Sequence, residues 1–169
     1  VTVNLKYGKF ESRTKPAGWN LGVFYPDIQI GYFRHPDGTV TATQDEAAID
    51  VAHQLTSYLE QTYGVDLVVN AGDNLDFPAF STHRSAPGFW DTTQLAIDRA
   101  SKEAAIQRAI APNSHIVWLE GNHESRLTKY LVDKAAPLVG LRRSGDSDPV
   151  VSVAHLCRFE DYGIDYIEP

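Results

Sequence analysis

Short apolar runs alternate with longer amphipathic stretches along this chain, and this alternation restricts the folds that the chain can adopt. The apolar runs lie at 21–25, 67–69 and 115–119, and each has the length of a buried strand. The stretches at 44–63 and 91–111 repeat apolar side chains at helical spacing. Parallel strands need long crossover connections, which are usually helices. The pattern therefore predicts an α/β fold with a mainly parallel sheet.

Turn and capping residues mark the expected ends of these helices. Thr43 and Glu46 have the spacing of a capping box, which predicts that the first helix begins near residue 44. Gly64 stands where a C-terminal cap is expected, and Pro112 stops the second helical stretch. Both helices are therefore expected to have defined ends.

The length of 169 residues fits one domain, and nothing in the sequence marks a boundary between two. We expect an N-terminal arm over 1–19 and a single domain over 20–169. Within that domain a third helical pattern follows residue 124. The tail is expected to contain short strands at 150–153 and 164–167.

Charge and cysteine content limit the partners and the compartment. The net charge of −7 argues against a broad basic surface, although acidic metal ligands contribute to it until metal neutralises them. The single cysteine, Cys157, cannot form an internal disulfide and is expected to be a buried thiol in a reducing, cytoplasmic setting. No run approaches the roughly 20 apolar residues of a membrane span. A membrane partner is therefore not expected, and no feature indicates an oligomeric state.

Polar side chains directly follow each of the three predicted strands. Because the carboxyl ends of parallel strands meet at one edge of a sheet, these side chains are expected to lie close together. Carboxylate and amide oxygens and imidazole nitrogen are ligands of divalent cations. The sequence therefore predicts a metal site at this edge. The residues concerned are Asp27, Gln29, Asp73, Asp76, Asn122 and His123.

Three motifs in this order resemble the calcineurin-like metallophosphoesterase superfamily, including bacteriophage-encoded members. They are Asp27-Ile28-Gln29, Gly72-Asp73-Asn74-Leu75-Asp76 and Gly121-Asn122-His123-Glu124. The resemblance implies the layered αββα sandwich of that superfamily. This chain would hold the N-terminal portion of the sandwich, which is the first sheet with its flanking helices.

The resemblance also implies two divalent metal ions. Asp27 would bind the first metal, Asp73 would bridge both, and Asn122 would bind the second. Gln29 stands where the superfamily usually has histidine, so it is a candidate ligand with a neutral oxygen, its alternative being a solvent-facing amide. This oxygen favours Mn²⁺ or Mg²⁺ over Zn²⁺, and Mn²⁺ is expected first, with Mg²⁺, Zn²⁺ and Fe as alternatives.

The remaining site residues receive roles beside the metals. The resemblance implies that His123 is catalytic and stabilises or protonates the departing oxygen, while Asp76 orients it. His83 and Arg126 are candidates for substrate binding. Their alternative interpretations are an exposed loop histidine and an ion pair on a helix surface.

The function implied is hydrolysis of a phosphate ester by metal-activated water. A phosphodiester, as in nucleic acid, is favoured over a phosphomonoester. The superfamily completes its metal shell with later histidines, and none is recognisable here, since His155 is a poor substitute. We expect them in a further C-terminal part, without which this portion is expected to be inactive. The rival hypothesis is a non-catalytic interaction domain with a degenerate metal site.

Overall fold

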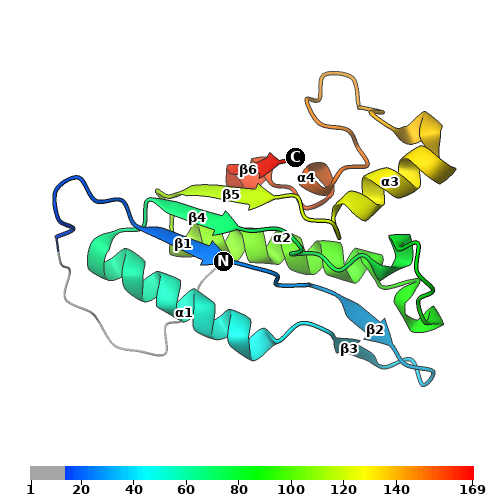
Figure 1. Cartoon of the computed structure of the whole chain (residues 1–169), viewed down its shortest axis with the longest axis horizontal. Coiled ribbons are helices and arrows are strands. Elements are labelled where there is room, and N and C mark those ends of the chain that lie inside the picture. The colour runs from blue at the N-terminus through cyan, green and yellow to red at the C-terminus, as the bar shows by residue number, and fades with distance from the viewer. Residues whose placement is uncertain (1–13) are drawn as a thin grey trace.

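A parallel sheet of four strands forms the centre of the computed structural model, which describes residues 14–169. Its strands are β1 (Gly22–Tyr25), β4 (Leu67–Asn70), β5 (His115–Leu119) and β6 (Ile164–Ile167). They lie in the order β1-β4-β5-β6, and every neighbouring pair is parallel. In Figure 1 their arrowheads all point to the side where α3 begins. The predicted α/β class, the parallel sheet and the strand at 164–167 are thereby confirmed.

Helices α1 (Glu46–Tyr63) and α2 (Thr93–Ile110) connect successive strands and contact each other. The predicted helices at these positions are confirmed, but the predicted capping box is wrong. Asp45, and not Thr43, caps α1, because its carboxylate accepts from the backbone N–H groups of Ala47 and Ala48. Gly64 ends α1 as expected, with a φ of 72°.

A short antiparallel hairpin extends from the sheet as β2 (Tyr32–Arg34) and β3 (Val40–Ala42). In the sequence, only the turn residues His35-Pro36-Asp37-Gly38 point to it. In the structure, the backbone N–H of His35 donates to the carbonyl of Thr39 across this turn. Strands of three residues are too short to show an alternating pattern, so neither was predicted.

The remaining elements are α3 (Ser125–Lys134), α4 (Val153–Leu156) and four single turns of 3-10 helix. Those turns are η1 (Pro78–Phe80), η2 (Pro87–Phe89), η3 (Ala136–Leu138) and η4 (Glu160–Tyr162). The strand predicted at 150–153 is wrong. Ser152 instead caps α4 by accepting from the backbone N–H of His155, and Val153 and Cys157, four residues apart, enter the core.

The core lies where the helices meet one face of the sheet. Val68, Ile116 and Trp118 on that face are all 0% exposed and share a cluster with alanines of α2. Side chains alternate between the faces of a strand, so Phe24 and Ile167 belong to the other face, where they are 64% and 49% exposed. No helix in the described part of the chain has the length and apolar character to cross a membrane.

A buried polar layer joins α1, α2 and β4 beneath this face. Glu103, 0% exposed, pairs with His53 and accepts from Arg99 Nη1 at 2.8 Å. Gln107 and Asn70 exchange two amide hydrogen bonds of 2.8 Å. Burial by itself raises the pKa of Glu103, but the hydrogen bonds and charges of His53 and Arg99 outweigh it and hold that pKa below its ordinary value. Each of the five polar-layer residues therefore has a partner.

Candidate functional site

The backbone turns after β1 and β4 run side by side. The N–H groups of Asp27, Gln29 and Ile30 donate to the carbonyl oxygens of Gly72, Asp73 and Asn74, at 3.3, 3.0 and 2.7 Å. These bonds extend the parallel pairing of β1 and β4 beyond the strands, as the bridge between Ile30 and Leu75 also shows. Residues 27 and 73 therefore lie at the same edge of the sheet.

The backbone is strained at the predicted ligand positions. Asp27, Gln29 and Asp73 have φ values of 53°, 50° and 52°, and Arg158 is the other non-glycine residue in residues 14–169 with positive φ. This left-handed region disfavours residues with a Cβ and is enriched at functional sites. The strained positions therefore coincide with the predicted ligands after β1 and β4.

The turn after β5 packs tightly against the turn after β4. A Cβ on Gly121 would lie 2.2 Å from both the backbone nitrogen and a carboxylate oxygen of Asp73. Gly72 has a φ of 86°, and a Cβ there would meet the Cα of Gly121 at 3.2 Å. Glycine at both positions therefore allows Asp73 and Asn122 to approach each other.

Two carboxylates join these turns reciprocally. Asp73 Oδ1 accepts from the backbone N–H of His123 at 2.9 Å. Glu124, 0% exposed, accepts from the backbone N–H groups of Asp73, Leu75 and Gly121 at 3.1, 2.8 and 2.9 Å. Glu124 was not predicted to have a role of its own. Only its position immediately after Asn122-His123 pointed to it.

The side-chain amide of Asn122 lies against the carboxylate of Asp73. With its N–H₂ group turned to this carboxylate, Asn122 donates to one oxygen of Asp73 at 2.9 Å and to the other at 3.3 Å. A carboxylate and an amide oxygen are also donor types that fit a hard divalent cation.

Asp27 and Gln29 meet in the turn after β1. Gln29 Nε2 donates to Asp27 Oδ1 at 2.7 Å, and both residues are exposed. This contact uses the amide nitrogen of Gln29 and leaves its oxygen for another partner. Among residues 14–169 no three His, Cys, Asp or Glu side chains gather as a metal-binding group. A metal here would therefore depend on amide oxygens as well as on carboxylates.

Asp76 contacts both His123 and Arg126. His123 Nδ1 lies 3.1 Å from Asp76 Oδ1, and Arg126 Nη1 donates to the same oxygen at 3.2 Å. The histidine contact has the distance of an ion pair but not the angle of a hydrogen bond, because Nδ1 has no hydrogen-bond partner. Arg126 is therefore in an ion pair with the predicted site residue Asp76.

A hollow of about 360 Å³ opens between η1 and α3, next to Asn122. We call it the α3 pocket. It brings His83 and Arg126, the predicted substrate-binding residues, to one surface with Asn122. The residues on which its chemistry depends are Phe80, His83, Asn122, Arg126, Lys129, Tyr130 and Lys134.

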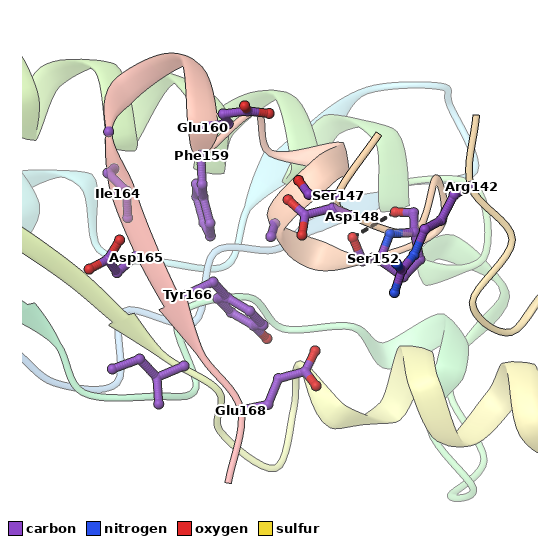
Figure 2. Close-up of a pocket in the computed structure, with 14 residues that line it drawn as sticks. Arg142, Ser147, Asp148, Ser152, Phe159, Glu160, Ile164, Asp165, Tyr166 and Glu168 are labelled. Atoms are coloured by element: carbon purple, nitrogen blue, oxygen red, sulfur yellow. Dashed lines mark hydrogen bonds between the residues drawn. The ribbon is translucent and has the colours of Figure 1, made fainter. Parts of the chain in front are cut away.

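A larger hollow, of about 840 Å³, lies beside β6 and contains none of the predicted site residues. Figure 2 shows its wall, with Tyr166 and Glu168 from the β6 end facing Arg142, Asp148 and Ser152 from the preceding loop. Its lining lacks the strained turns and paired ligands found after β1, β4 and β5. The strand tips are therefore the stronger candidate site.

One acidic group near the tips has a perturbed pKa. Burial raises the pKa of Glu120 above its ordinary value, and the negative charge of Glu168 adds to the effect. Tyr166 Oη donates to Glu120 Oε1 at 3.4 Å. Glu120 thus connects β6 to the turn that carries Asn122.

The residues of the tip cluster, at the ends of three adjacent strands, are Asp27, Gln29, Asp73, Asp76, Asn122 and His123. No protein-family model, curated protein or solved structure matches the chain.

Proposed function

We propose that this protein is a metal-dependent hydrolase of phosphate esters with the calcineurin-like αββα fold. The observation that carries the proposal is the approach of the Asn122 side-chain amide to the Asp73 carboxylate, at 2.9 Å, between the tips of adjacent parallel strands. Strained backbone at Asp27, Gln29 and Asp73 supports it, because such strain is concentrated at functional sites.

The tip cluster supplies the ligands for two divalent cations. Asp27 would hold one, Asp73 would bridge, Asn122 would hold the other, and the amide oxygen of Gln29 is available to the first. An all-oxygen donor set favours Mn²⁺ or Mg²⁺. When bound, the metals supply an activated water and neutralise phosphate charge.

His123 is the group that moves a proton. Its Nδ1 faces Asp76 at 3.1 Å, and this contact orients the imidazole. A protonated His123 donates to the departing oxygen. Arg126 shares Asp76 with His123, so it keeps this carboxylate in place and adds positive charge near the substrate phosphate.

The substrate class that fits best is a phosphodiester. Asp27, Gln29 and Asn122 are all exposed, so the reacting group can belong to a large molecule. A phosphomonoester also fits the ligand set, and the two are separated by experiment. The exposed Phe24 and Ile167 support the fold, because a second layer in the sandwich would cover that face.

The test uses a chain extended with the C-terminal part that is expected to supply the later histidines. It measures metal content by mass spectrometry and turnover with Mn²⁺ added. We expect two Mn²⁺ per chain and faster hydrolysis of bis-p-nitrophenyl phosphate than of p-nitrophenyl phosphate. Asp73→Asn is expected to lose both metal and turnover. Asp37→Asn, in the hairpin turn after β2, is the matched control and should keep both.

Two results would contradict the proposal in different ways. Metal without turnover of either ester supports the rival hypothesis of an interaction domain with a degenerate site. If the protein binds no metal and hydrolyses neither ester, the proposed metal site is ruled out.

A further inference from the structure

The α3 pocket has an aromatic wall that is fixed from the core. Phe77 is 1% exposed and packs edge-on against Phe80, with ring centroids 5.4 Å apart. Phe80 in turn packs against Tyr130 at 5.3 Å. Tyr130 is 42% exposed, so part of its ring is available to a ligand. The wall is therefore in place before any ligand binds.

The same pocket is positively charged, unlike the chain as a whole. Arg126, Lys129 and Lys134 line it together with one carboxylate, Asp133, and Arg126 also pairs with Asp76, so one positive charge remains in excess, whereas the whole chain has a net charge of −7. Lys129 Nζ donates to Ser125 Oγ at 2.9 Å, which holds the ammonium group over the start of α3. A concentration of positive charge in an acidic protein points to an anionic ligand.

Stacking on an exposed aromatic ring beside positive charge is the chemistry by which proteins bind single-stranded nucleic acid. We propose that the α3 pocket binds one nucleotide of a single strand, with its base on Tyr130 and its phosphate at Arg126, Lys129 and Lys134. The proposal rests on the proposed function, since Asn122 at the pocket rim places the neighbouring phosphate at the tip cluster.

The pocket size and its contacts favour an unpaired nucleotide. A volume of about 360 Å³ accommodates a single nucleoside. A base can stack on Tyr130 only if its own face is free, which excludes a base inside a duplex. Stacking and phosphate contacts are independent of base identity, so little sequence preference is expected.

The experiment uses binding without turnover. A thymidine dinucleotide with a 5′ phosphate is titrated calorimetrically into the protein in EDTA. A second titration uses the same molecule lacking one of its two bases. We expect the complete dinucleotide to bind about tenfold or more tightly than its base-deleted counterpart. Tyr130→Ala should remove that difference, and Tyr130→Phe should keep it.

Trp19→Ala is the matched control, because Trp19 is an exposed aromatic that precedes β1, at the opposite end of the strands. It should leave both affinities unchanged. Lys134→Ala should weaken both probes equally and reduce the salt dependence of binding. Circular dichroism of each variant identifies any loss of folding, and Tyr130→Leu replaces Tyr130→Ala if that variant does not fold.

The outcomes separate this inference from the proposed function. Tyr130-dependent binding with no hydrolysis of any ester keeps the pocket and removes the hydrolase. Hydrolysis of bis-p-nitrophenyl phosphate combined with equal affinity for the two dinucleotides overturns the pocket and keeps the hydrolase. Tighter binding of a phosphotyrosine peptide than of the dinucleotide overturns the assignment to nucleic acid. Equal affinity for free thymidine monophosphate and for the dinucleotide overturns the assignment to a strand, because the ligand is then a mononucleotide.

Discussion

The polar layer beneath the sheet and the tip cluster at its edge differ in how their polar atoms are satisfied. In the polar layer, Glu103 receives donors from His53 and Arg99, and Gln107 and Asn70 exchange two hydrogen bonds. In the tip cluster, Asn122 donates to Asp73 once its amide is turned, but Asp27, Gln29 and Asn122 are exposed and the buried Nδ1 of His123 has no hydrogen-bond partner. The polar layer is paired within the chain, whereas the tip cluster leaves polar atoms open to a partner.

The backbone shows the same difference. Asn70 and Gln107 belong to a regular strand and a regular helix, while Asp27, Gln29 and Asp73 all have positive φ. A strained, exposed cluster of acceptors reduces the stability of the folded state. A buried cluster whose polar groups are paired need not reduce that stability. The difference indicates that stability is maintained beneath the sheet and binding occurs at its edge.

The largest expected effect is on catalytic rate. His123→Ala should lower kcat by roughly 10²–10⁴-fold, since it removes the proton donor, and should leave metal content unchanged. Steady-state kinetics together with metal analysis provide the measurement. If His123→Ala loses metal as fully as Asp73→Asn does, then His123 belongs to the ligands and its assigned role is wrong.

Glu124→Gln tests whether the tip cluster depends on a partner from within the chain. Its carboxylate accepts three backbone N–H groups, and a glutamine amide would turn an N–H₂ group towards some of them. We expect a loss of about 3 kcal/mol in the free energy of unfolding, measured by urea denaturation. Metal affinity should fall by roughly tenfold, since the turns lose their alignment.

Glu160→Gln is the matched control for this substitution, because Glu160 is exposed. It should change neither stability nor metal affinity. An unchanged urea midpoint for Glu124→Gln would show that the reciprocal bonds do not hold the turns.

Glu103→Gln addresses the polar layer. The pKa of Glu103 is held below its ordinary value of 4.5, so its carboxylate stabilises the folded state fully above that pH, and the contribution is lost as pH falls through the lowered pKa. We expect a loss of about 2 kcal/mol at pH 7 and a smaller loss at pH 4 and below. Thermal unfolding across this range measures both, and a difference that grows on acidification would contradict the pairing.

The smallest effect is expected at Gln29. Gln29→Gly should raise the free energy of unfolding by about 1 kcal/mol, because glycine adopts a φ of 50° without strain. The same substitution should weaken Mn²⁺ binding by less than about tenfold, since one neutral ligand is lost. A gain in stability with no change in Mn²⁺ affinity would mean that Gln29 is a solvent-facing amide.

The sequence predicted those elements whose pattern is long or repeated. The apolar runs at β1, β4 and β5 and the periodic stretches of α1 and α2 predicted the sheet, and the residues after each run predicted the tip cluster. The three-residue strands β2 and β3 were not predictable, because so short a segment carries no period. Residues 150–153 were read as a strand because three of the four are valine, which is β-branched and favours strands, but the Ser152 cap determined a helix.

The role of Glu124 could not be predicted from the sequence, for a different reason. Its acceptors act on backbone N–H groups of Asp73 and Leu75, about fifty positions earlier, and any residue carries such a group. A hydrogen bond to a backbone N–H group therefore does not depend on which side chain the partner residue has. The pairing of His53 with Glu103 was equally hidden, since each residue alone reads as an ordinary member of its helix.

The buried carboxylate of Glu124 couples the two turns that approach each other at Gly121. The amides of Asp73, Leu75 and Gly121 all donate to it, so an opening that displaces Glu124 exposes the three together. We expect their amide protons to exchange with deuterium as one cooperative unit. A change in one turn is therefore expected to reach the ligand positions on the other.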